Sequence, residues 1–126
     1  MMKYGRLLMS PEQFCLWHEV HVLTSFPQRL LGLLTKRGLP RGHAYWFPSC
    51  SAVHSWGMLF AIDIVGLDKN QRITAIRRNV QPGVMLKLQG VHSIIECEAG
   101  YPYPLEAWCG RRVIFEEREV NHEEVL

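Results

Sequence analysis

Potentially reactive side chains are densest between Pro48 and Met58, where a thiol, an imidazole, three hydroxyls and an indole occur within eleven residues. Cys50 and His54 are four positions apart, and an imidazole beside a thiol favours the reactive thiolate. The pair would supply a nucleophile and its base, or two ligands of a zinc ion that needs three or four. Alternatively, Cys50 is a small buried apolar residue and His54 donates to a backbone carbonyl.

Asp63 is the second candidate, because it interrupts the apolar stretch 60–65, which is typical of a central strand covered on both faces. A buried carboxylate there needs a partner, either His54, a loop hydroxyl, an arginine or several backbone N–H groups. If the chain turns back near Gly57, Asp63 would orient His54 and complete a Cys/His/Asp arrangement. The alternative that we favour is a structural lock.

Other candidate chemistries are weaker. His18 and His21 are three positions apart, a spacing that places them on opposite faces of a regular strand, so we expect no metal pair there. No Gly-rich phosphate loop, G-x-S-x-G elbow or H-E-x-x-H motif occurs in the sequence. We therefore expect neither a metal nor a cofactor, and a protein that is not an enzyme is the favoured interpretation.

Three basic doublets, 36–37, 77–78 and 111–112, would form a phosphate-binding surface if the fold brought them together, with Tyr45 and Trp46 as stacking partners. Solvated faces explain the doublets equally well. The chain has 14 basic and 12 acidic residues, a net charge of +2, which does not by itself indicate a nucleic-acid partner. Nucleic-acid binding is therefore not the expected function.

The four cysteines are widely spaced and include no C-x-x-C pair, which argues against a zinc ribbon or a dithiol redox motif. The N-terminal residues lack the apolar core of a signal peptide, and no apolar stretch is long enough to span a membrane. We therefore expect a cytoplasmic protein with reduced thiols and no membrane association.

These candidate residues must be positioned by short strands. Ser25 and Gln28 form a capping box that opens an amphipathic helix ending near Gly38. Aromatic and β-branched residues, alternation and turn signals predict the rest. The predicted strands are 4–9 paired with 14–23, then 44–47, 59–67 in a hairpin with 72–77, 84–88, 92–97 and 113–115.

This pattern predicts a mostly β (α+β) protein, a compact antiparallel β-sandwich or distorted barrel with one short helix. A chain of 126 residues is long enough to bury its own core, so we expect one domain over 1–115. Residues 116–126 are acidic and weakly patterned, and we expect a flexible C-terminal tail there.

The pattern Pro48-x-Cys50-x-x-Val53-His54-Ser55-x-Gly57-Met58-x-Phe60-x-Ile62-Asp63 resembles the bacterial and archaeal domain-of-unknown-function family 192. Val80-x-Pro82-Gly83 and Ile95-Glu96-x-x-Ala99-Gly100 are also similar to the family, so the resemblance covers about residues 25 to 115. It implies a single β-rich domain with a short helix and no established activity. It also marks five motif positions in this sequence: Cys50, His54, Ser55, Met58 and Asp63.

Three functional hypotheses follow. The first is a binding module whose polar pocket near Cys50, His54 and Asp63 holds a small polar ligand or a peptide. The second is an enzyme that uses Cys50 as nucleophile and His54 as base. The third is an interaction protein in which the motif is purely structural. The sequence does not identify the ligand, the partner or the oligomeric state.

Overall fold

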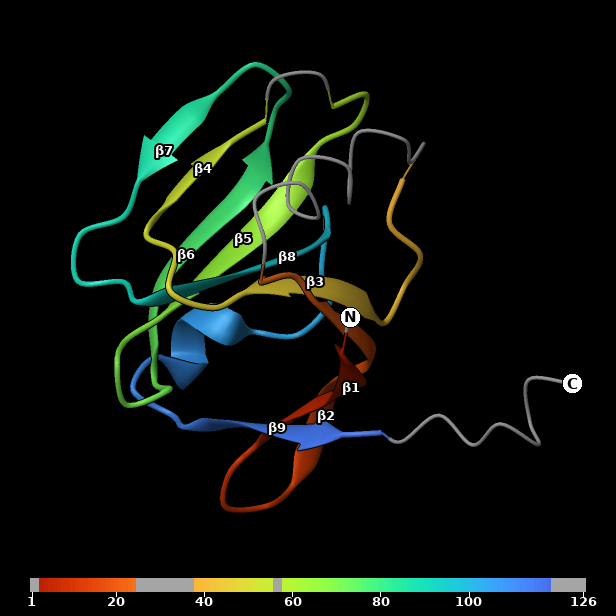
Figure 1. The fold of residues 1–126 in the computed structure, drawn as a ribbon, viewed down its shortest axis with the longest axis vertical. Helices are drawn as coiled ribbons and strands as arrows, with labels where there is room; N and C mark the ends of the chain where they lie inside the picture. The colour runs from red at the N-terminus through yellow and green to blue at the C-terminus, as the bar shows by residue number, and fades with distance from the viewer. Residues whose placement is uncertain (1–2, 25–37, 56–57, 119–126) are drawn as a thin grey trace, which may run out of the picture.

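The computed structural model describes residues 3–24, 38–55 and 58–118, and the regular structure in them is almost entirely β-strand (Figure 1). The predicted mostly β class is confirmed. The helix predicted to begin at Ser25 lies outside the described residues. The elements are β1 (Lys3–Met9), β2 (Phe14–Val22), β3 (His43–Phe47), β4 (Ala52–His54), β5 (Ile62–Leu67), β6 (Ile73–Val80), β7 (Met85–Lys87), β8 (Ser93–Glu98), the 3-10 turn η1 (Leu105–Trp108) and β9 (Val113–Glu117).

Seven strands form one mixed sheet in the order β6-β5-β8-β3-β2-β1-β9. The predicted antiparallel pairings of β1 with β2 and of β5 with β6 are confirmed. One neighbouring pair is parallel, β2 with β3, which makes the sheet mixed rather than purely antiparallel. β4 and β7 pair separately, so the reactive segment contributes a short strand of its own.

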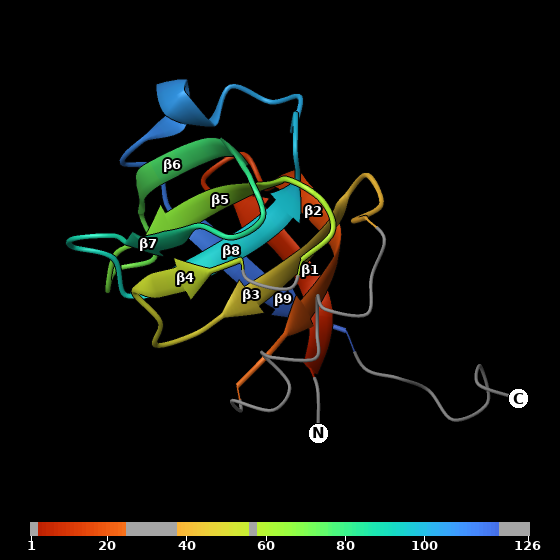
Figure 2. The same cartoon turned by 90° about the horizontal axis from the view of Figure 1, so that it is seen from above.

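The sheet curls until its two edge strands meet at one end. Arg72, just before β6, bridges to Arg112, just before β9, and the Ile73 N–H donates to the Arg111 carbonyl at 3.0 Å. Figure 2 shows the β1, β2 and β9 part of the sheet passing across the β3, β5 and β8 part. Over the described residues the sheet is not a closed barrel, because β6 and β9 meet only at this end.

The concave, inner face of the sheet buries one apolar cluster, and η1 contributes Leu105 to it. Strand alternation sends residues from all seven strands inward. We call this group the inner cluster: Leu7, Met9, Leu16, Trp17, Val20, Ala44, Val65, Leu67, Ile73, Ile95, Cys97, Tyr101, Leu105 and Val113.

A second apolar cluster lies on the outer face of β3, β5, β6 and β8, where the β4–β7 pair contributes side chains to it. Burying one large apolar side chain in this way stabilises the folded state by about 1.5–3 kcal/mol. We call this group the outer cluster: Leu23, Leu39, Tyr45, Phe47, Cys50, Val53, Met58, Ile62, Ile64, Val80, Leu88, Val91 and Ile94.

The end of the sheet extends beyond the predicted tail boundary. β9 runs through Glu117, so residues 116 and 117 belong to the sheet, whereas 119–126 lie outside the described residues. In the described part of the chain, no helix has the length and apolar character needed to cross a membrane.

Candidate functional site

Cys50 lies in a buried, apolar setting. Its side chain belongs to the outer cluster, and its thiol donates to the Ala52 carbonyl at 3.1 Å. The Cys50 N–H donates to the His92 carbonyl at 2.8 Å, which fixes the start of the segment before β4. The backbone of His54 pairs with Met85, but the His54 side chain lies outside the described residues.

Ser55 holds a turn rather than facing an open site. Its hydroxyl donates to the Gln81 carbonyl at 2.8 Å and accepts from the Val84 N–H at 2.9 Å. The backbone N–H of Ser55 also donates to the Val84 carbonyl, and the side chain is fully buried. Met58 lies nearby in the sequence and is 7% exposed within the outer cluster. Both motif residues thus contribute to the packing around β4 and β7.

Asp63 is fully buried on β5, as its place in an apolar strand predicted. One carboxylate oxygen, Oδ1, accepts from the Asn79 N–H at 2.8 Å. The other, Oδ2, accepts from Arg78 Nη1 at 2.8 Å and from the N–H groups of Gly100 and Tyr101 at 3.1 and 2.9 Å. An arginine and backbone N–H groups were among the predicted partners of this carboxylate, and they are the ones found.

Arg78 uses all five of its N–H donors. Nε and Nη2 bind the Glu106 carboxylate at 2.7 and 2.9 Å, and Nη1 donates to Asp63. The remaining hydrogens go to the carbonyls of Tyr101 and Tyr103 at 2.8 and 2.9 Å. The hydrogen bonds from Arg78 lower the pKa of Glu106 to about 2. We call these residues, Asp63, Arg78 and Glu106, the Asp63 network.

Asp63 and Cys50 belong to opposite faces of the sheet. Alternation along β5 sends Ile62 and Ile64 into the outer cluster, where Cys50 lies, and Val65 into the inner cluster with Asp63 on the same side. Asp63 pairs with Cys97 of the inner cluster, and burial, with a smaller effect of the Asp63 charge, raises the pKa of that thiol. The structure thus brings Asp63 to Arg78 and does not bring it to Cys50.

The basic doublets do not combine into one surface in the described residues. Arg78 is occupied by the Asp63 network, and Arg111 binds the Ser10 carbonyl and the Glu12 carboxylate. The first doublet, 36–37, lies outside the described residues. Trp46 is partly buried against the inner cluster, and Tyr45 is buried in the outer cluster, on the opposite face of the sheet.

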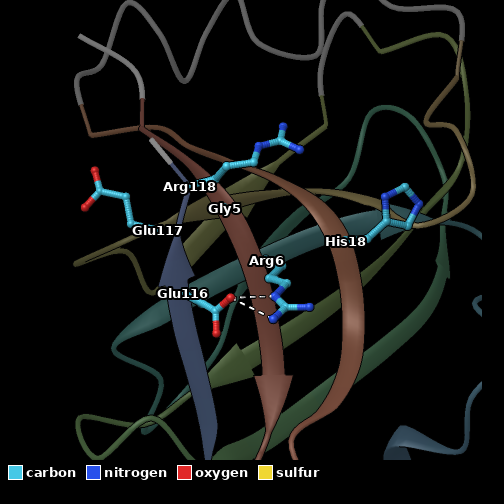
Figure 3. A pocket seen from close by; sticks show the side chains of 6 residues that line it. All are labelled: Gly5, Arg6, His18, Glu116, Glu117 and Arg118. Carbon is cyan, nitrogen blue, oxygen red and sulfur yellow. Dashed lines mark hydrogen bonds and ion pairs between the residues drawn. The ribbon is translucent and has the colours of Figure 1, made fainter. Parts of the chain in front are cut away.

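A cavity lies elsewhere, on β1, β2 and β9, with a volume of about 470 Å³ (Figure 3). Arg6 and Glu116 are cross-strand partners there, and their neighbours Leu7 and Phe115 pack inward, so both side chains point outward. The residues that line the cavity are Gly5, Arg6, His18, Glu116, Glu117 and Arg118.

The charges of this cavity are only partly paired. Arg6 binds a single oxygen of Glu116, through Nε at 2.8 Å and Nη2 at 2.7 Å. Both side chains are about half exposed, at 49% and 52%. Arg118 reaches out of the cavity to Glu19, at 2.7 Å. The second oxygen of Glu116 and the Nη1 group of Arg6 therefore stay available to another molecule.

A β-bulge in β2 positions His18 at this cavity. The N–H groups of His18 and Glu19 both donate to one carbonyl, that of Gly42, at 3.0 and 3.2 Å. The bulge shifts the alternation, so His18 and His21 both contact the ring of His43, with centroids 5.6 and 6.3 Å apart. The prediction that these two histidines face opposite sides is therefore wrong, since it assumed a regular strand.

Gly42 leaves the space that His18 occupies. Its φ is +81°, and a Cβ atom there would lie 2.3 Å from His18 Nε2. Only glycine adopts this positive φ without strain and also lacks the Cβ atom that would collide with His18. Although three imidazoles gather nearby, no group of three or more His, Cys, Asp or Glu side chains in the described ranges is arranged to hold a metal ion.

Sequence reasoning did not single out Arg6, Glu116 or their neighbours on β9, and it considered His18 only as a metal ligand and discounted it. Arg6 and Glu116 are 110 positions apart and come together only through the pairing of β1 with β9. Each carries an ordinary surface charge in an unremarkable local pattern. A sequence signal was present only for Gly42, which lies in a Pro/Gly-containing turn, and it does not by itself indicate a cavity.

Two solved structures share this fold. A structure from Sinorhizobium meliloti 1021, described as that of a proposed transcription regulator, has 18% identity and a TM-score of 0.70, over 91% of this chain and 94% of that chain. A protein of unknown function from Novosphingobium aromaticivorans DSM 12444 has 16% identity and a TM-score of 0.72, over 88% and 84%. At these identities the two structures show the fold alone.

No curated protein matches the chain. The family model DUF192, described as an uncharacterized ACR, matches residues 9–115. This range includes every residue that carried the resemblance in the sequence, from Pro48 to Asp63 and on to Gly100. The chain belongs to the DUF192 family.

Proposed function

We propose that the protein is a non-enzymatic binding module that holds a small polar ligand in the cavity between β1, β2 and β9. The observation that carries this proposal is the partial pairing of Arg6 with Glu116 inside a hollow that His18 and Glu117 also line. Ligand sites combine a concave surface of about 300–1,000 Å³ with a few convergent polar groups. The cavity, at about 470 Å³, lies in this range, and the Arg6–Glu116 pair lines it.

The motif residues support the scaffold in this proposal. Cys50 and Met58 fill the outer cluster, Ser55 fastens the turn before β7, and Asp63 joins β5 to the segment before η1. A Cys50 nucleophile finds no support in the described geometry, because its thiol is buried and the carboxylate that would orient a base faces the other side of the sheet.

The experiment is a screen of small polar metabolites against the isotope-labelled protein, with binding followed by amide chemical shifts in NMR spectra. Saturable shifts at Gly5, Arg6, His18 and residues 116–118 are the expected result. Arg6→Gln should weaken them, whereas Lys69→Gln, which removes the same charge from an exposed turn far along the chain, should not. Saturable shifts near Cys50 alone, with none at the cavity, would contradict the proposed site.

A further inference from the structure

We propose a second ligand site, formed by Arg72 and Arg112 where the edge strands of the sheet meet, for a phosphoryl dianion, either inorganic phosphate or a phosphate monoester. We call these two residues the arginine pair. Arg72 belongs to none of the three basic doublets, and the fold places it directly opposite Arg112. Figure 1 shows the turn between β5 and β6 beside the start of β9. The site is separate from the cavity, because Arg112 precedes Glu116 by four residues, about 13 Å along an extended strand.

The backbone holds the arginine pair close together on the outward face of the sheet. The hydrogen bonds flank the pair, since the N–H groups of Ile73 and Val113 donate across the bridge at 3.0 and 2.8 Å. In a non-hydrogen-bonded pair of this kind the Cα atoms are about 4.5 Å apart and the side chains are close. Ile73 and Val113 belong to the inner cluster, so the alternating arginines point outward, and both are exposed.

The two positive charges of the arginine pair are not offset by a described carboxylate. Neither arginine forms an ion pair with a described side chain. Asp68, in the adjoining turn, uses Oδ1 to accept from two backbone N–H groups, and Glu12 binds Arg111. Like charges directly opposite each other in a sheet destabilise the pairing of the strands. An anion bound between the two guanidinium groups would remove this repulsion.

The donors of the arginine pair suit a phosphoryl group. Arg72 Nη1 donates to the Gly110 carbonyl at 2.8 Å, which holds this guanidinium beside the bridge, and the Arg112 side chain donates to no described acceptor. A guanidinium binds two oxygens at once, so two of them can share a phosphoryl group with three free oxygens. A phosphate monoester carries a charge of about −1.5 to −2 at pH 7, which matches two arginines, whereas a carboxylate carries one charge.

NMR titrations of the full chain at constant ionic strength test the site. The probes are two dianions, inorganic phosphate and glycerol phosphate, and two monoanions, acetate and dimethyl phosphate. We expect the dianions to shift the amides of residues 70–73 and 110–113 saturably. They should bind about tenfold more tightly than the monoanions, a difference of about 1.4 kcal/mol. Equal affinity for both kinds of anion, or no saturable shift, would overturn the proposal.

The variant Arg112→Gln should weaken the binding of phosphate about tenfold. The matched control is Arg77→Gln, which removes another exposed arginine from β6 and should leave the titration unchanged. Equal losses in the two variants would mean that phosphate responds only to net charge and would overturn the site. A single-stranded oligonucleotide that binds at these amides more tightly than glycerol phosphate would assign the pair to a nucleic acid and overturn the small ligand.

Thermal unfolding distinguishes a ligand site from a structural role of the arginine pair. In chloride buffer, Arg112→Gln should melt no lower than the wild type, because the substitution removes the repulsion between the arginines. Phosphate should then raise the Tm of the wild type more than that of the variant, since a ligand stabilises the state that binds it. A variant that melts several degrees lower in chloride, or gains as much from phosphate, would contradict the proposal. If Arg112→Gln does not fold, Arg112→Lys is titrated in its place and should still weaken phosphate binding, because lysine lacks the two-pronged donor geometry.

Discussion

Two groups of charged residues in this protein differ in how completely their hydrogen bonds are made. In the Asp63 network, Arg78 uses all five donors and the Asp63 carboxylate accepts four hydrogen bonds. In the cavity, Arg6 binds one oxygen of Glu116 and both side chains are about half exposed. A saturated, buried network contributes to the fold, whereas a partly paired, exposed one keeps capacity for a ligand. The motif residue Asp63 and the residues of the proposed binding site therefore lie in different regions of this chain.

The strongest test of this contrast is Arg78→Met. It leaves Asp63 buried without its cation, and breaking a buried pair in this way costs about 3–5 kcal/mol. We expect this loss in urea unfolding followed by tryptophan fluorescence. The control Arg77→Met changes the exposed neighbour and should stay within about 0.5 kcal/mol of the wild type. Equal stability of the two variants would show that the Asp63 network does not stabilise the fold. If Arg78→Met does not fold, the same unfolding experiment is made with the milder variant Arg78→Lys.

The second test concerns the backbone under the cavity. A Cβ atom on Gly5 would lie 2.2 Å from the Glu116 carbonyl oxygen and 2.6 Å from the Phe115 ring, so Gly5→Ala should push β9 away from β1. Overpacking of this kind costs about 1–3 kcal/mol. The matched control is Gly38→Ala, whose Cβ meets no atom within 4 Å. Thermal unfolding of the two variants measures the difference, and a Gly5→Ala protein as stable as its control would contradict the close pairing.

The third test uses pH. Hydrogen bonds from Arg78 lower the pKa of Glu106 from its ordinary 4.5 to about 2, so its ionised form stabilises the fold above the ordinary value. This contribution is lost as the pH falls from 4.5 toward 2. Glu106 is half exposed, so Glu106→Gln should cost less than about 1 kcal/mol at neutral pH. Urea unfolding across this range should show the wild type and the variant converging, and a constant difference would argue against the ion pair.

The smallest effect on stability is expected at the cavity itself. Arg6→Gln removes an exposed ion pair and should change the free energy of unfolding by less than about 0.5 kcal/mol. The same variant should weaken ligand binding in the NMR screen. A variant that loses several kcal/mol would place Arg6 with Asp63 among the residues that hold the fold, and the contrast between the two regions would disappear.

The sequence alone predicted a feature of the structure where a residue would be energetically costly without a specific partner. An acidic residue in the apolar strand 60–65 predicted a buried carboxylate with strong partners, and Asp63 is one. It did not identify Arg78, because that pairing depends on the register of the β5–β6 hairpin and on an irregularity near Asn79, whose φ is +53°. No pattern within the segment shows such an irregularity.

The errors and omissions have the same origin. His18 and His21 share a face because two N–H groups donate to one carbonyl of Gly42, a tertiary contact that spacing alone does not show. The cavity depends on strands from the two ends of the chain, so no local window contains it. Hydrophobic alternation predicts which residues are buried, but strand pairing decides which polar residues meet.

The pairing of β1 with β9 also determines when the fold can be completed during synthesis. Arg6 leaves the ribosome 110 residues before Glu116, and until then β1 has only β2 as a neighbour. One edge of the sheet stays open, and Val113 is missing from the inner cluster. Contacts this distant in sequence slow folding, because loop closure must precede the stabilising pairing. The nascent chain therefore presents an unpaired, apolar-sided strand for most of its translation, which is the state in which chaperones protect proteins from aggregation.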